Sequence, residues 1–183
     1  GRIRAWLCFR GMSNCSDELI VRMKEMADRF GVGLQAHACF AKETRDSSVN
    51  AHGMTEVERL HRLGVLDRNL LLIHMGWATP NELFLLKEHD VKVVAAPSSS
   101  FHNAYGNVKM GHIPELLEMG VAVGIGSDHA SSGIVDICQE MFLLACGYKE
   151  SRLNPKIMPP ETVLEMATIN GARIALWEDE IGS

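Results

Sequence analysis

The stretch Leu70-Leu71-Leu72-Ile73-His74 decides the fold class, because it is apolar throughout and then stops at an imidazole. A run of this length is short for a helix, and it is typical of a strand buried on both faces of a parallel sheet. Working outward along the chain, similar apolar runs predict further strands over residues 4–9, 32–38, 91–96 and 121–127.

Longer amphipathic segments separate the apolar runs. The clearest covers residues 17–30, where Ser16 or Asp17 caps the start and Gly31 ends the helix. Strands that alternate with helices predict the α/β class, as either a (β/α) barrel or a doubly wound sheet. No glycine-rich phosphate loop follows a strand, so a nucleotide-binding fold has no support. We expect helices over residues 17–30, 55–64, 81–89, 113–119, 134–149 and 160–176, and a turn over residues 98–103.

The composition excludes several classes of protein. With 46% hydrophobic and 22% charged residues, the chain has globular usage and not that of a disordered protein. Its net charge of −5 argues against a nucleic-acid partner, which requires a basic face. No apolar run reaches the roughly 20 residues of a membrane span, and residues 1–4 do not open a signal peptide. Five cysteines without a Cys-x-x-Cys pair predict free thiols in a reducing compartment, and hence a cytoplasmic protein.

Three metal-ligand side chains stand at the carboxyl ends of predicted strands: His37, His74 and Asp128. In a (β/α) barrel these ends meet at one rim, where the chemistry takes place. Two imidazoles and a carboxylate suit one divalent metal ion, Zn²⁺ first and Fe²⁺ or Mn²⁺ as alternatives. Asp128 could bind the metal with one oxygen and take a proton from an attacking water with the other. His74 could bind the metal or orient that water.

A series of short motifs then runs along nearly the whole chain. The motifs are Ser16-Asp17-Glu18-Leu19, His37, residues 71–77 (LLIHMGW), 97–100 (PSSS), 124–128 (GIGSD), 166–173 (MATINGAR) and 179–183 (DEIGS). Through their order and spacing, the chain resembles the aminohydrolase branch of the amidohydrolase superfamily. That branch contains chlorotriazine hydrolases, adenosylhomocysteine or methylthioadenosine deaminases, and guanine deaminases.

The resemblance implies a metal-assisted hydrolase on a (β/α)₈ barrel. By this resemblance His37 is a metal ligand, His74 lies beside the metal and assists the water or the leaving group, and Asp128 is both ligand and general base. The implied substrate is a small heterocycle, such as a purine-, pterin- or triazine-like ring. The implied reaction is hydrolysis of a C–N bond by deamination, with C–Cl hydrolysis as a sister option.

The sequence departs from the family pattern at two points. The family has a His-x-His pair at the end of its first barrel strand, and no such pair occurs here. Deaminases of the branch show His-x-x-Glu at the second strand end as a proton shuttle, whereas this chain has Phe40 at the matching position. Glu43 is the nearest carboxylate, and a loop could return it to the site as the shuttle. Cys39 is expected to be a buried apolar residue and not a thiolate ligand.

The resemblance also implies that the chain covers only part of the barrel. We count five strands where a full barrel has eight, and they resemble the last five, without the first strands or the family's small β-sandwich. Residues 1–183 are therefore expected to form a single incomplete barrel domain of a truncated or incompletely encoded protein. Two open sheet edges favour association with another chain, so we expect a homo-oligomer. The activity is expected of the full-length form, and this chain alone is expected to be inactive. The alternative is a catalytically incompetent remnant that acts only as a structural or binding subunit.

Four further residues are candidates for substrate binding. They are Trp77, His102, His129 and Ser132. A flat indole such as that of Trp77 suits a heterocyclic ring, and His102 follows the fourth predicted strand. His129 directly follows the candidate metal ligand at position 128, and Ser132 or its neighbour Ser131 could orient that carboxylate or the substrate.

Overall fold

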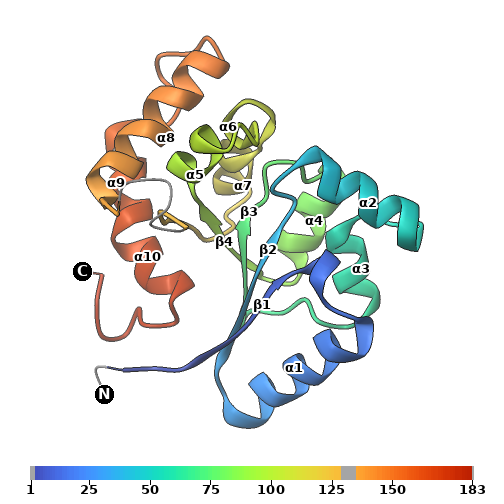
Figure 1. Ribbon diagram of the computed structural model, residues 1–183. Helices are drawn as coiled ribbons and strands as arrows, with labels where there is room; N and C mark the ends of the chain where they lie inside the picture. Colours follow the sequence, from blue (N-terminus) through green and yellow to red (C-terminus); the bar gives the residue numbers. More distant parts are fainter. Residues whose placement is uncertain (1–2, 129–134, 183) are drawn as a thin grey trace.

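A computed structural model describes residues 3–128 and 135–182 of the chain (Figure 1). Five strands form a parallel sheet in the order β1-β2-β3-β4-β5. Each strand pairs with the next one in sequence, so the described sheet has no point of reversal, which excludes the doubly wound alternative. The order is that of successive β/α units. The strands are β1 (Trp6–Gly11), β2 (Gly33–Ala38), β3 (Leu70–His74), β4 (Lys92–Ala95) and β5 (Val123–Ile125).

Helices connect consecutive strands and continue beyond the last one. In Figure 1, α1 to α4 lie to the right of the strands and α8 to α10 to the left. Among the residues described, no helix has both the length and the apolar character needed to cross a membrane. The helices are a 3₁₀ turn η1 (Met12–Asn14), α1 (Asp17–Phe30), α2 (Lys42–His52), α3 (Glu56–Arg62), α4 (Pro80–Glu88), α5 (Pro97–His102), α6 (Asn107–Met110), α7 (Ile113–Glu118), α8 (Ile137–Ser151), α9 (Pro160–Ala167) and α10 (Ile169–Ile174).

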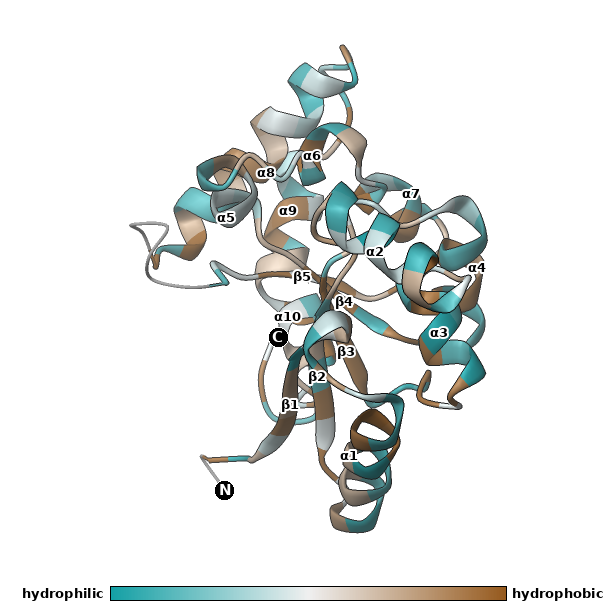
Figure 2. Ribbon diagram, turned by 45° about the vertical axis from the view of Figure 1, so that its right-hand side comes forward, coloured by the Kyte–Doolittle hydropathy of each residue, from teal (hydrophilic) through white to brown (hydrophobic). Residues whose placement is uncertain are grey.

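One layer of buried side chains crosses the whole sheet. In register from β1 to β5 it consists of Phe9, Ala36, Leu72, Val93 and Val123, all at most 3% exposed. Registered residues of parallel strands point to the same face, so this layer forms the floor on which the helices pack. The hydropathy colouring agrees: the strands are mostly brown, and the helices alternate between brown and teal (Figure 2).

The opposite face of the sheet is only partly covered, which corrects the prediction of strands buried on both faces. In the registered row on this face, Leu71 and Lys92 are nearly buried and Gln35 is half-buried. Cys8, at the edge of the row, is exposed. A groove of about 540 Å³ opens on this face. The described helices cover the floor face more completely than this one. The groove is lined by Arg10, Gln35, His37, Leu71, Ile73, Val94 and Asp128.

Two sequence predictions are confirmed with their bounds. Helix α1 covers residues 17–30, its Ser16 cap accepts a hydrogen bond from the Leu19 amide, and Gly31 ends it in the left-handed conformation. Strand β3 covers residues 70–74. The five cysteines, all in the described residues, are free thiols.

Other elements differ from the prediction for identifiable reasons. The helix expected over 160–176 is divided at Thr168, whose φ of −121° and ψ of −94° leave the helical region. The turn expected over 98–103 is instead helix α5, which begins at Pro97, a residue suited to the first helical turn. Helix α2 was not predicted, because its polar sequence KETRDSSVNAH lacks an apolar stripe.

Gly76 gives a test of how tightly the loop after β3 is packed. A Cβ at this position would lie 2.1 Å from Oδ1 of Asn107 and 2.5 Å from its Cα. Since backbone must move to relieve this overlap, Gly76→Ala is expected to lower the free energy of unfolding by about 1–3 kcal/mol. Chemical denaturation measures the change.

The matched control is Gly171→Ala in α10, where the nearest atom, the Met166 carbonyl oxygen, lies at an ordinary 3.5 Å. Alanine favours a helix over glycine by about 1 kcal/mol, so this variant should be as stable as the wild type or more stable. Equal stability of the two variants would contradict the packing described here.

Candidate metal centre

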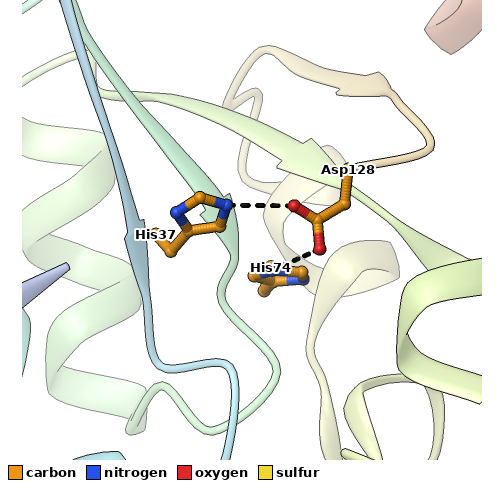
Figure 3. A group of neighbouring side chains, drawn as sticks. All are labelled: His37, His74 and Asp128. Atoms are coloured by element: carbon orange, nitrogen blue, oxygen red, sulfur yellow. Dashed lines mark hydrogen bonds and ion pairs between the residues drawn. The ribbon is translucent and has the colours of Figure 1, made fainter. Parts of the chain in front are cut away.

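Three side chains converge at the carboxyl edge of the sheet. His37 lies near the end of β2, His74 ends β3, and Asp128 follows β5 (Figure 3). One ligand atom from each lies within 4.8 Å of the other two. The structure thus brings together the three residues that the strand ends indicated. The cause is the parallel order of the strands, which aligns their carboxyl ends on one edge.

The Asp128 carboxylate stands between the two imidazoles. Its Oδ1 lies 3.0 Å from Nε2 of His37, and its Oδ2 lies 3.6 Å from Nε2 of His74. The two imidazole rings stack with their centroids 5.4 Å apart and an interplanar angle of 29°. The side chains of His74 and Asp128 are 2% and 10% exposed, although Asp128 is exposed when its backbone is included. The ligand atoms therefore lie below the surface, with an opening beside them.

The hydrogen bonds of His37 fix which of its nitrogens can bind a metal. Nδ1 lies 2.6 Å from the Arg10 carbonyl oxygen, which can only accept, so Nδ1 carries a proton. Nε2 then faces the Asp128 carboxylate with either a second proton or a cation between them. A neutral histidine held by a backbone carbonyl at Nδ1 and open at Nε2 is the usual form of a metal ligand. The donor set therefore fits a divalent cation.

His37 and Asp128 shift each other's pKa in opposite directions. The hydrogen bond to Asp128 raises the pKa of His37, against the opposing effect of burial, and the bond to the Arg10 carbonyl adds to the rise. Burial alone would raise the pKa of Asp128, but hydrogen bonds from His37 and Ser99 and the charge of His74 outweigh it and hold that pKa well below its usual range. Asp128 is therefore a carboxylate at neutral pH, as a metal ligand requires.

Ser99 is a site residue that the sequence analysis missed. It is fully buried, and its Oγ donates a hydrogen bond of 2.6 Å to Oδ2 of Asp128. The sequence signal was the run Ser98-Ser99-Ser100, which we interpreted as a turn. The serines expected to orient Asp128, at positions 131 and 132, lie outside the described residues, as does His129.

Strained backbone accompanies the cluster. His74, Met75 and Asp128 have φ angles of +86°, +55° and +68°, and Cys39 has +50°. Non-glycine residues seldom adopt such angles, and they are enriched at functional sites, where the surrounding structure holds them. These four are among the nine non-glycine residues with positive φ in the described part of the chain, and they lie at the ends of the three strands that carry the candidate ligands.

Two buried carboxylates hold the loops that follow β2 and β3. Glu56 accepts a 2.7 Å hydrogen bond from the Cys39 amide, and Glu82 accepts bonds from the amides of Val57 and Thr79. Burial raises the pKa of Glu56 and also that of the Cys39 thiol, which is fully buried. Cys39 is thus a buried residue, as predicted. Its carbonyl accepts from the Trp77 amide at 2.8 Å, which joins the loop after His37 to the loop after His74.

An aromatic wall, formed by Phe40 and Tyr105, flanks His74. The Phe40 ring lies 5.8 Å from the His74 ring and 5.2 Å from the Tyr105 ring, and Tyr105 lies 6.1 Å from His74, between centroids. Trp77 supports this wall indirectly, because its indole N–H donates to the Tyr105 carbonyl at 2.8 Å. Phe40, which the sequence analysis noted only as a departure, therefore lies beside the candidate metal centre.

The remaining predicted residues lie apart from the cluster. Glu43 is exposed in the first turn of α2, and His102 is exposed at the end of α5. Among the described contacts, none joins either of them to the three ligands. Their predicted roles in proton transfer and substrate binding stay predictions.

Comparisons with known proteins show which proteins the chain is similar to. The chain matches the amidohydrolase family over residues 1–183. It is 33% identical to a 5-methylthioadenosine/S-adenosylhomocysteine deaminase of Aquifex aeolicus, over 92% of this chain and 39% of that protein. It is 34% identical to an S-triazine hydrolase of Gordonia rubripertincta, over 100% of this chain and 37% of that protein.

A solved structure extends the comparison to three dimensions. The crystal structure of an adenosine deaminase from Xanthomonas campestris with bound zinc superposes with a TM-score of 0.83 at 28% identity, over 92% of this chain and 38% of that one. The chain thus spans about two fifths of the length of the proteins it matches.

Zinc titration of the purified chain tests the ligand assignment. His37→Gln removes the Nε2 ligand and is expected to weaken zinc affinity by at least about tenfold. The control is His61→Gln, because His61 lies on α3 and pairs with His89 at 3.1 Å, in a different part of the fold. Competition with a chromophoric chelator measures both affinities, and equal weakening by the two variants would contradict the assignment.

The pH dependence of zinc binding follows from the raised pKa of His37. Zinc must displace the Nε2 proton, so affinity should rise with pH, by up to about tenfold per pH unit below that pKa. Titrations between about pH 6 and about pH 8 cover the range in which histidine changes charge. A flat profile would show that no proton is released at this histidine.

Proposed function

The chain belongs to the amidohydrolase family, and we propose that it supplies His37, His74 and Asp128 to a divalent-metal centre that hydrolyses a C–N or C–Cl bond of a heterocyclic substrate. The observation that carries the proposal is the placement of one donor atom from each of three strand ends within 4.8 Å of the others. Deamination is the first candidate reaction, because deaminases are among the relatives.

The donor set supports zinc as the metal. Zinc accepts imidazole nitrogen and carboxylate oxygen, and catalytic zinc sites commonly have three protein ligands and one open position. Fe²⁺ and Mn²⁺ accept the same ligands and are the alternatives. One ion per chain is proposed, since the described residues contain one such group of three.

Each residue of the cluster has a chemical task in this proposal. His37, His74 and Asp128 would hold a divalent ion, which would lower the pKa of a coordinated water to about 7 and so make that water a nucleophile at neutral pH. Asp128 would take the proton of that water, because its two oxygens are held by His37 and Ser99 at the place where the three ligand atoms meet. His74, nearly buried beside Asp128, binds the ion or orients the water and the leaving group.

The aromatic wall supports a flat substrate. Phe40 and Tyr105 present ring surfaces next to His74, and planar heterocycles gain binding energy from contact with aromatic rings. The adenosine derivatives and triazines named for the relatives are heterocycles of this kind. The substrate is therefore proposed to be a purine-, pterin- or triazine-like ring.

The barrel, the assembly and the location of the protein are also proposals. The sequential strand order and the partly open face support five consecutive units of an eight-stranded barrel in one domain. Edge strands β1 and β5 each pair on one side within the described residues, which favours association with further strands, including those of a second copy. Free thiols support a reducing compartment such as the cytoplasm.

A second function is favoured by one observation. Phe40 lies beside His74 and has no group that transfers protons. It stands at the sequence position where the resemblance implies the glutamate of the deaminases' His-x-x-Glu motif. The second candidate is thus a subunit that keeps the fold without catalysis. An enzyme should bind zinc and also turn over a substrate, whereas such a subunit should show no turnover.

Asp128→Asn tests the assigned base. The amide cannot accept the water proton, so turnover of the zinc-loaded full-length protein should fall by at least about 100-fold. Ammonia release from a panel of purine nucleosides, guanine and aminotriazines measures it. Asp46→Asn on the exposed face of α2 is the matched control and should keep wild-type turnover. Undiminished activity of the Asp128→Asn variant would rule out this base.

Phe40→Leu tests the aromatic wall. The substitution keeps an apolar side chain but removes the ring, so KM should rise by about 2–10-fold, the equivalent of about 0.5–1.5 kcal/mol, while kcat changes little. Phe30→Leu, at an exposed position on α1, should leave both constants unchanged. A large fall in kcat with constant KM would indicate that Phe40 acts in the chemical step.

A further inference from the structure

Three consecutive serines in α5 are buried, which is unusual for hydroxyl side chains. Ser98, Ser99 and Ser100 are 6%, 0% and 3% exposed. Each hydroxyl has its own partner: Glu140 for Ser98, Asp128 for Ser99, and the Asn107 amide for Ser100. The run therefore ties α5 to three other segments.

The Ser99 bond reaches the candidate metal centre directly. Its Oγ donates at 2.6 Å to Oδ2 of Asp128, the oxygen that also lies 3.6 Å from His74. Oδ1 of the same carboxylate faces His37. A donor on one oxygen and an imidazole on the other fix the rotation of the carboxylate about its Cβ–Cγ bond.

Glu140 anchors the helix that carries Ser99. Its side chain is fully buried, its Oε1 accepts a hydrogen bond from the Ser98 hydroxyl, and its Oε2 accepts one of 3.0 Å from the Ser98 amide. Glu140 belongs to α8, so a residue far along the chain holds the first turn of α5 in place. A buried carboxylate with two donors is costly to remove, because its partners then lose their hydrogen bonds.

We propose that Ser99 is a positioning residue of the metal centre, which orients the Asp128 carboxylate for the cation, and that Glu140 fixes Ser99 through Ser98. This inference rests on the proposed function, because it assigns a role toward the same site. Groups that hydrogen-bond to a ligating side chain typically change metal affinity by about 10–100-fold when they are removed.

Two single substitutions in one helix test the role of Ser99. Ser99→Ala should weaken zinc affinity about tenfold, as measured by competition with a chromophoric chelator. Ser100→Ala is the matched control, because it removes an equally buried hydroxyl whose partner is Asn107 and not Asp128. It should lower thermal stability and leave zinc affinity within about twofold of wild type.

A second variant and a second readout keep the test valid if Ser99→Ala does not fold. Ser99→Cys has nearly the same shape but only a weak donor, and it should also weaken zinc binding. Substitution with Co²⁺ gives a visible spectrum that reports ligand geometry, and this spectrum should change in the Ser99 variants and stay constant in Ser100→Ala.

The proposed role of Glu140, which is to fix Ser99 through Ser98, has its own test. Glu140→Gln keeps the shape of the side chain but cannot accept both Ser98 bonds, so zinc affinity should fall severalfold. Combined with Ser99→Ala, the loss should be smaller than the two losses together, because both act through one hydrogen bond. Additive losses would overturn the link through Ser98.

The outcomes separate this inference from the proposed function. Wild-type protein that binds no zinc overturns both. Wild-type protein that binds zinc, with affinity and Co²⁺ spectrum unaffected in the Ser99 variants, overturns the positioning role and leaves the metal centre standing. Equal weakening by Ser99→Ala and Ser100→Ala assigns the effect to general loss of packing in α5 and also overturns the inference.

Discussion

The Asp128 carboxylate is the point on which the rest of the site depends. It interacts with His37 from β2, His74 from β3 and Ser99 from α5. Three segments thus contact the two oxygens of a residue that belongs to a fourth, the segment after β5. Such a group would be poorly solvated if it stood alone below the surface, and its ionised form persists because donors surround it. A divalent cation would replace the Nε2 proton of His37 and take the lone pairs of the two imidazoles and the carboxylate.

Buried carboxylates extend this principle away from the metal centre. Glu56, Glu82 and Glu140 are at most 2% exposed, and each accepts a hydrogen bond from a backbone amide in a segment that follows a strand: Cys39, Thr79 and Ser98. A buried acid must have donors, and irregular loop backbone must have acceptors. Pairing the two requirements stiffens the loops that follow the strands. One of these pairings holds a strained position, because the amide bound by Glu56 is that of Cys39, whose φ is +50°.

One face of the sheet packs in the hydrophobic core, and the other face leads to the candidate metal centre. The row from Phe9 to Val123 is buried beneath the helices and supplies the core. The other face opens into a groove that reaches His37 and Asp128, and the aromatic wall of Phe40 and Tyr105 stands beside His74. Registered parallel strands give every second residue to each face, so one sheet provides both a packed floor and an accessible site.

The sequence by itself determined the α/β class, helix α1, strand β3 and the convergence of His37, His74 and Asp128, because apolar runs, helix caps and strand ends are local signals. It did not determine the helical state of Pro97–His102, the role of Ser99 or the contact between Phe40 and His74. Those features depend on partners distant in the chain, such as Glu140 for α5 and Tyr105 for Phe40. Only the tertiary structure decides such pairs, since a hydrogen bond or ring contact between remote segments leaves no periodic pattern in either one.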